Sequence, residues 1–114
     1  SHILLLVDSE DDLFLFNYAR TRLGEQSMTI RICFINEQVD KQLKSRIMND
    51  FVQIDSNKFV LDKPLTMNTF IENKETLLVM SYTTCEKLSK DQELFAKLPS
   101  LLIIRPRQLK VEKI

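Results

Sequence analysis

Four acidic side chains lie within five consecutive residues, directly after the first apolar segment of the chain. The run is Asp8-Ser9-Glu10-Asp11-Asp12. Clustered carboxylates of this kind could hold a divalent metal ion, as they do in phosphoacceptor pockets. They would also stabilise the first turn of a helix without any ligand, because negative charge complements the helix dipole there. We take Asp8 and Ser9 as candidate ligand-binding residues and assign no metal site.

A second polar group follows a later apolar segment and contains Ser81, Thr83 and Thr84. Their hydroxyl groups could bind a ligand, or they could satisfy the backbone groups of a loop. If both apolar segments are parallel strands, their carboxyl ends meet at one edge of the sheet, which is where open α/β sheets bind ligands. Ser81 and Thr83 are therefore the further candidate ligand-binding residues.

The residue types needed for a complete catalytic site are sparse. His2 is the only histidine and lies at the start of the sequence, while Cys33 and Cys85 have no cysteine or histidine near them. The single glycine, Gly24, excludes the glycine-rich loops that wrap phosphate groups. We therefore predict that the chain is not an enzyme, has no catalytic residues, uses no cofactor and binds nucleotides weakly or not at all.

The charge balance also narrows the classes of partner. Sixteen basic and sixteen acidic side chains give the chain a formal net charge of zero. The basic residues are scattered, without interleaved aromatic residues, so we predict that nucleic acid is not a partner. Zero net charge does not oppose association of the chain with a second copy of itself.

Short apolar runs predict strands that are covered on both faces. The predicted strands are residues 3–7, 28–35, a short or kinked segment within 52–61, 76–80 and 101–104. The predicted helices run from Ser9 to Gly24, from Val39 to Phe51, from Pro64 for a short distance, and from Ser89 to Pro99. Ser9 with Asp12, and Ser89 with Gln92, match the spacing of a capping box. Residues 81–87 are predicted to form a polar loop.

This alternation of strands and helices predicts an α/β fold with right-handed crossovers. We expect a Rossmann-like, three-layer α/β/α domain whose five-stranded, mainly parallel sheet has the strand order 3-2-1-4-5. Residues 1–107 would form this single domain and residues 108–114 a C-terminal tail. No apolar run approaches the ~18 residues of a membrane span, so we expect this fragment to be soluble. The opening Ser1-His2 is typical of a domain cut from a longer protein.

Two segments resemble the universal stress protein superfamily. Residues 3–12 form an apolar strand that ends in Asp8 and leads into a helix, and residues 99–106 are similar to the family's final strand. Residues 76–80 are similar to its fourth strand. Nucleotide-binding members carry a glycine-rich loop after that strand, whereas residues 81–89 contain no glycine. The chain is more similar to the degenerate, universal stress protein-like domains at the cytosolic C-terminus of bacterial cation/proton (Na+/H+) antiporters.

This resemblance implies a non-catalytic regulatory or dimerisation domain on the cytoplasmic side of the inner membrane. Its partners would be the transmembrane transporter domain of the same parent chain and a second copy of itself. Members of the superfamily often dimerise through their final strand, and an unpaired edge strand readily adds a partner strand. The candidate dimer-interface residues are Leu101, Ile103, Leu109 and Val111. Residues 105–107, Arg-Pro-Arg, would instead be typical of an edge that blocks such pairing.

Two alternative interpretations remain open. A degenerate response-regulator receiver domain would account for the acidic run, and Arg105-Pro106 looks a little like the Lys-Pro pair of that family. Its phosphoacceptor would then have to be Asp62. A stand-alone, universal stress protein-like module that binds a ligand is the other alternative.

Overall fold

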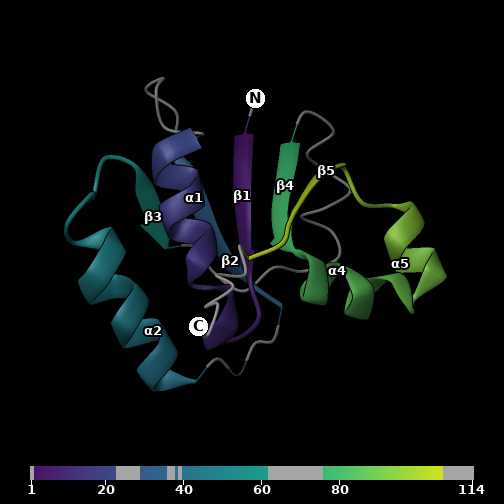
Figure 1. Ribbon diagram of the computed structural model, residues 1–114, viewed down its shortest axis with the longest axis horizontal. Helices are drawn as coiled ribbons and strands as arrows, with labels where there is room; N and C mark the ends of the chain where they lie inside the picture. Colours follow the sequence, from purple (N-terminus) through teal and green to yellow (C-terminus); the bar gives the residue numbers. More distant parts are fainter. Residues whose placement is uncertain (1, 23–28, 36–37, 39, 62–75, 107–114) are drawn as a thin grey trace, which may run out of the picture.

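A five-stranded sheet forms the centre of the molecule, as the computed structural model shows in Figure 1. The structure describes residues 2–22, 29–35, 38, 40–61 and 76–106. The strands are β1 (His2–Val7), β2 (Ile30–Phe34), β3 (Phe59–Leu61), β4 (Thr76–Ser81) and β5 (Ser100–Ile104). All neighbouring strands pair in parallel, in the spatial order β3-β2-β1-β4-β5. The predicted α/β fold with strand order 3-2-1-4-5 is therefore confirmed.

The central position of β1 explains its unbroken apolar sequence. Leu5 is in register with Ile32 of β2 on one side and with Val79 of β4 on the other. Leu4 and Leu5 point to opposite faces of the sheet, because side chains alternate along a strand, and both are buried. Since helices cover both faces at this strand, every position on it favours an apolar residue.

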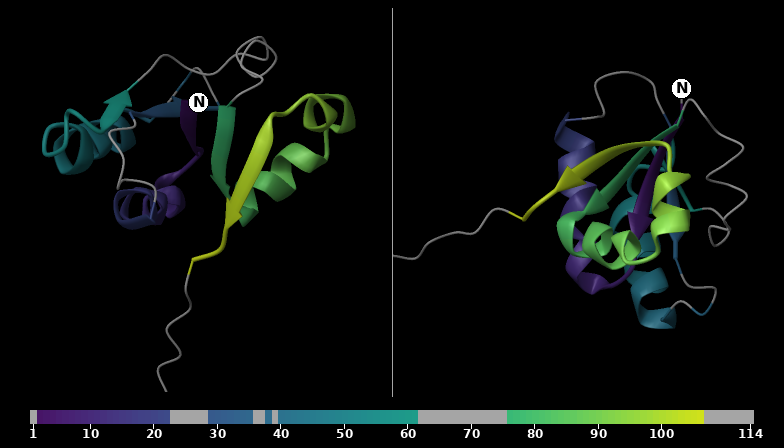
Figure 2. Two further views of the ribbon diagram at one scale, coloured as in Figure 1. Left: turned by 90° about the horizontal axis from the view of Figure 1, so that it is seen from above. Right: turned by 90° about the vertical axis from the view of Figure 1, so that its right-hand side faces the viewer.

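One face of the sheet is covered by the helical segments that follow β1 and β2 (Figures 1 and 2). These segments are a 3₁₀ turn (Glu10–Asp12), α1 (Phe14–Arg22), α2 (Lys41–Ile47) and a π-helical stretch (Met48–Val52). The ring of Phe16 stacks on that of Phe51, with 4.3 Å between the ring centroids, and meets Phe59 edge-on at 5.4 Å. This aromatic cluster joins α1 to the π-helical stretch that contains Phe51 and to β3.

The opposite face is covered by α4 (Tyr82–Ser89) and α5 (Gln92–Ala96), as Figure 2 shows. Cys85 and Leu88 of α4 belong to the same apolar cluster as Leu78 and Met80 of β4. The described residues thus place helices on both faces of the sheet, which is consistent with the predicted Rossmann-like arrangement.

The helix α4 corrects the prediction that residues 81–87 form a polar loop. Ser81 caps this helix, because its Oγ accepts a hydrogen bond from the backbone N–H of Thr84 at 3.2 Å. Cys85 and Leu88 are the only apolar residues on the buried face of α4, and two apolar residues are too short a pattern to indicate a helix in the sequence. Packing of that face against the sheet stabilises a helix whose own sequence is mostly polar.

The predicted capping box of Ser89 with Gln92 is also wrong. Ser89 is the last residue of α4, and its hydroxyl donates to the carbonyl oxygen of Glu86 at 2.8 Å. Asp91 caps α5 instead, since its Oδ1 accepts a hydrogen bond from the backbone N–H of Leu94 at 3.1 Å. Aspartate and serine are similarly good N-caps, so the sequence alone did not decide between the two positions.

The other predicted boundaries have mixed outcomes. The capping box of Ser9 and Asp12 is confirmed, although it opens a 3₁₀ turn that leads through Leu13 into α1. The ambiguous segment within 52–61 contains the end of the π-helical stretch and the short strand β3. The helix end at Gly24 and the short helix at Pro64 lie outside the described residues, as do Asp62 and the tail 108–114. In the part of the chain that the structure describes, no helix is long and apolar enough to cross a membrane.

The strand β5 lies at one edge of the sheet. Leu101 is partly buried and packs on the face covered by α4 and α5. Ile103 remains 42% exposed, which makes it one of the most exposed large apolar residues of the described chain. The other two candidate interface residues, Leu109 and Val111, lie outside the described residues.

Candidate functional site at the carboxyl edge of the sheet

The candidate ligand-binding residues lie at the carboxyl edge of the sheet, near the boundary between β1 and β4. Asp8 and Ser9 follow β1, Ser81 ends β4, and Thr83 lies in the first turn of α4. β2 lies on one side of this pair of strands and β5 on the other, so the chain winds in opposite directions from this boundary. Such a topological switch point is where open α/β sheets bind ligands.

The carboxylate of Asp12 joins the two sides of this switch point. Its Oδ2 accepts hydrogen bonds from the backbone N–H groups of Asp8 at 2.7 Å and Ser9 at 3.2 Å, and from the Thr84 hydroxyl at 3.3 Å. Asp12 is 3% exposed and Thr84 is 1% exposed. Hydrogen bonds to an acceptor of this kind offset the cost of burying it. Asp12 therefore holds the segment after β1 against the start of α4.

The hydroxyl residues after β4 divide between the interior and the surface. Ser81 Oγ donates to Thr84 Oγ1 at 3.0 Å, and both side chains are buried. Thr83, in contrast, is exposed. The structure therefore brings Ser81 into the network around Asp12 but leaves Thr83 outside it. Sequence reasoning named the Thr84 hydroxyl but selected Thr83 instead, because it treated this segment as a loop. In a helix, Thr84 and Leu88 are four residues apart and share one face.

Lys87 of α4 forms an ion pair with Asp8 at the surface of the switch point. Its Nζ donates a hydrogen bond to Asp8 Oδ2 at 2.7 Å. The side chain of Asp8 is 13% exposed, whereas that of Lys87 is 63% exposed. The hydrogen bond with Asp8 raises the pKa of the Lys87 ammonium group, and the negative charge of Asp8 adds to the effect. The cation beside this carboxylate is thus supplied by the chain itself.

The acidic run does not converge on a metal-binding arrangement. Asp12 points into the protein, Asp8 contacts Lys87, and Glu10 forms an ion pair with Arg46 of α2. Across residues 2–22, 29–35, 38, 40–61 and 76–106, no three His, Cys, Asp or Glu side chains form a group that could hold a metal ion.

The two cysteines lie in the apolar cluster on the α4 side of the sheet. Both thiols are buried and free of disulfide bonds. Burial raises the pKa of the Cys85 thiol. Since the thiolate is the nucleophilic form of cysteine, this environment does not favour a role for Cys85 in covalent chemistry.

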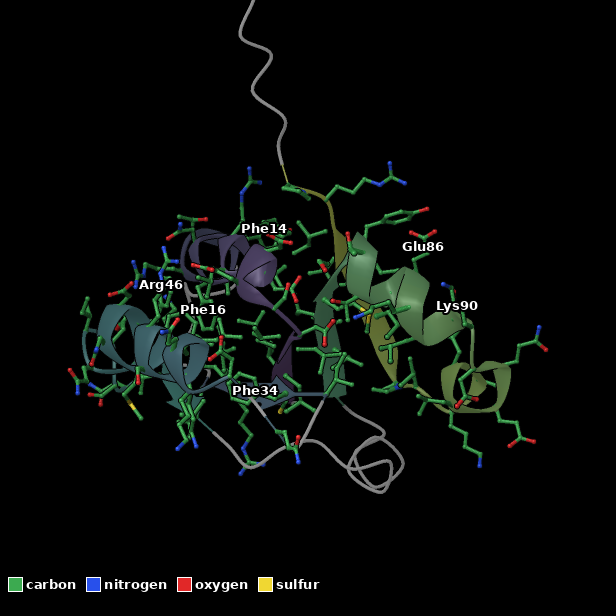
Figure 3. All side chains as sticks on the ribbon, turned by 90° about the horizontal axis from the view of Figure 1, so that it is seen from below. Phe14, Phe16, Phe34, Arg46, Glu86 and Lys90 are labelled. Atoms are coloured by element: carbon green, nitrogen blue, oxygen red, sulfur yellow. The ribbon has the colours of Figure 1, made fainter. Side chains whose placement is uncertain are left out.

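A pocket of about 310 Å³ opens at the same edge of the sheet, on the β2 side of β1. Val7, Phe34 and Leu43 line it, and all three are buried. Asp8 and Ser9 contribute polar groups to its wall. Figure 3 shows Arg46 extending from α2 on the side of the sheet that carries α1, where it pairs with Glu10. Asp8 and Ser9 therefore face a cavity, whereas Ser81 belongs to the buried network.

A second hollow lies beyond the ends of β4 and β5. Tyr82, Thr83, Arg105 and Pro106 line it. The guanidinium carbon of Arg105 is 3.9 Å from the centroid of the Tyr82 ring, which is a cation–π contact. Arg105 and Tyr82 are both exposed, so this contact forms at the surface.

No protein-family model, curated protein or solved structure matches the chain. The structure establishes a five-stranded parallel α/β domain with strand order 3-2-1-4-5.

Proposed function

We propose that this chain is a non-catalytic regulatory and dimerisation domain. The observation that carries the proposal is the occupied switch point between β1 and β4. There Asp12 binds three donors of the chain itself, and Lys87 covers Asp8. A ligand or substrate that took the place of Asp12 would have to displace the hydrogen bonds of a buried carboxylate, which is costly. This occupancy supports a role that does not depend on chemistry at the switch point.

The proposed parent protein is a bacterial membrane cation/proton antiporter, with this domain on the cytoplasmic side of the inner membrane. That attribution rests on the sequence resemblance of residues 3–12, 76–80 and 99–106 to the universal stress protein-like domains of such transporters. The strand order supports the same choice over a receiver domain, because the flavodoxin-like folds to which receivers belong have the order 2-1-3-4-5.

Pairing through β5 is the proposed mode of dimerisation. An edge strand carries unpaired backbone donors and acceptors that a second copy can satisfy. Leu101 packs on the face covered by α4 and α5, and Ile103 leaves apolar surface exposed on the same strand. Covering that surface in a dimer would stabilise the association by removing apolar area from water.

Sedimentation velocity of the wild-type chain at high micromolar concentration tests this mode of pairing. Ile103→Lys places a charge on the proposed interface, and we expect it to be monomeric where the wild type is dimeric. Val60→Lys is the matched control, because Val60 lies on the opposite edge strand β3 with a similar exposure of 40%, against 42% for Ile103. The control should remain dimeric, and circular dichroism should show both variants folded.

Two results would contradict the proposal. A wild-type chain that stays monomeric at several hundred micromolar would remove dimerisation through β5. A complete reading frame that contains this chain but no transmembrane segments would remove the antiporter as its parent, without bearing on whether β5 pairs.

A further inference from the structure

The pocket between β1 and α2 has the volume of a small-molecule site. Its volume of about 310 Å³ is at the lower end of the usual range for such sites. Val7, Phe34 and Leu43 give the pocket an apolar base, of which Phe34 and Leu43 keep a small exposed surface of 3% and 8%. This base is made from the ends of two adjacent strands and from α2, which fixes its position at the carboxyl edge of the sheet.

The charged side chains in the wall of the pocket are mainly acidic. Asp8, Glu10 and Asp40 contribute three carboxylates, and Arg46 is the one cationic side chain among the described residues of the lining. An anionic ligand would therefore meet an excess of negative charge. Unlike charges attract and like charges repel within a few ångströms, and water at the exposed side chains of Glu10, Asp40 and Arg46 screens both effects. The wall thus favours a positively charged ligand over phosphate or carboxylate compounds.

Two of these acids already bind organic cations that belong to the chain. The alkylammonium group of Lys87 contacts Asp8, and the guanidinium group of Arg46 contacts Glu10. Arg46 also lies 3.6 Å from Asp50, so its charge is shared between two carboxylates. These internal pairs show which chemical groups the acids around this pocket accommodate.

Asp40 differs from the other two acids of the wall. Its Oδ1 accepts a hydrogen bond from the backbone N–H of Gln42 at 3.0 Å and caps α2. Among the residues that the structure describes, no cationic side chain forms an ion pair with it. Asp40 therefore offers a carboxylate charge next to the apolar base, without a counter-ion from the described part of the chain.

We propose that this pocket binds a small organic cation, a primary amine or a guanidine that carries a compact apolar group. The apolar group lies on Phe34 and Leu43, and the cationic group binds Asp40. This proposal goes beyond the regulatory and dimerisation function, and it does not require β5 to pair with a second copy. The ligand would be a small metabolite that carries a free amine or guanidine group.

Titrations with three probes of similar shape test the charge requirement. The probes are benzylamine, benzyl alcohol and benzoate, which are cationic, neutral and anionic at neutral pH. Amide ¹H–¹⁵N spectra of the complete chain should show saturable shifts with benzylamine at and around Val7, Phe34 and Leu43. We expect weaker binding of benzyl alcohol and no saturation with benzoate.

Two matched aspartate substitutions test the role of Asp40. Asp40→Asn keeps a good N-cap for α2 and removes the charge, so we expect about fivefold weaker binding of benzylamine, the usual difference between a charged and a neutral acceptor. Asp91→Asn is the control, because Asp91 is an exposed N-cap of α5 outside the pocket. Gln42→Arg adds a cation to the pocket wall without changing the cap residue and should also weaken binding.

Several results would overturn the inference. Equal binding of benzyl alcohol and benzylamine would mean that the site recognises apolar surface alone. Tighter binding of benzoate than of benzylamine would assign the pocket to anionic ligands. Unchanged affinity in both Asp40→Asn and Gln42→Arg, with dispersed spectra that show folded variants, would exclude Asp40 and this pocket as the binding site.

Discussion

Asp12 and Thr84 are 72 positions apart in the sequence, yet the Thr84 hydroxyl donates a hydrogen bond to the Asp12 carboxylate at 3.3 Å. Both side chains are almost completely buried. The bond connects the first helical turn to the start of α4 across the β1–β4 boundary, so the two halves of the sheet are joined by side chains as well as by backbone pairing.

Replacing Asp12 with alanine should destabilise the domain by about 2 kcal/mol, the usual cost of leaving buried donors without an acceptor. The substitution leaves the N–H groups of Asp8 and Ser9 and the Thr84 hydroxyl without this partner. Urea unfolding measures the loss. Asp11→Ala is the control, since Asp11 is exposed and should change stability by no more than about 0.5 kcal/mol. Equal effects of the two substitutions would contradict the structural role of Asp12.

The ion pair of Lys87 with Asp8 should stabilise the domain only below strongly alkaline pH. The folded-state pKa of Lys87 is raised above the ordinary value of 10.5. Its contribution is therefore complete below the unfolded-state pKa and is lost as the pH rises through the folded-state pKa. Lys87→Met should be less stable than the wild type at neutral pH, and this difference should shrink above pH 10.5.

Urea unfolding at neutral pH and at several alkaline values measures this dependence. Lys44→Met, at an exposed position of α2, controls for the general effect of removing a lysine charge. A difference between wild type and Lys87→Met that stays constant through the alkaline range would show that the pair does not stabilise the fold.

Replacing each of the two serines at the ends of α4 with alanine should change the free energy of unfolding by different amounts. Ser81→Ala removes the N-cap of this helix and should cost about 1 kcal/mol of unfolding free energy. Ser89→Ala removes only a hydroxyl that bonds back to Glu86 at an exposed position, and its effect should stay within about 0.5 kcal/mol. Chemical denaturation of both variants tests the assignment. A larger effect at Ser89 would favour the capping box predicted from the sequence.

Calorimetric titration with ATP and magnesium should give weak binding or none. Residues 81–89 contain no glycine to wrap the phosphates, and Glu10 and Asp11 present negative charge at the first helical turn after β1. Magnesium chloride alone is the control titration. A micromolar dissociation constant for ATP would favour the alternative of a ligand-binding, universal stress protein-like module.

The sheet could be predicted because its strands are short apolar runs with a clear chemical signature. Leu4, Leu5 and Leu6 must all be apolar when both faces of β1 are covered, and alternation with helices then restricts the topology. The helix α4 could not be predicted in the same way. Its polar sequence fits a loop equally well, and its stability depends on packing against β4, which only the tertiary structure supplies.

The candidate site was predictable in its location but not in its contacts. Asp8 and Ser81 lie at the expected edge of the sheet because parallel strands end on the same side. Whether Thr83 or Thr84 faces inward depends on how α4 is rotated against the sheet. This rotation could not be considered while the segment was predicted to be a loop. The pocket beside Asp8 needs Leu43 from α2, and no local pattern relates that residue to β1.

The central position of β1 has a consequence for the order in which the domain forms. Its neighbour β2 begins at Ile30, but its other neighbour, β4, begins only at Thr76. During synthesis, one side of this apolar strand has no partner until most of the chain has been made. Long-range parallel pairing forms slowly, and an apolar strand edge that is open in the meantime promotes aggregation. Refolding yield should therefore fall as protein concentration rises, even if the native domain is stable.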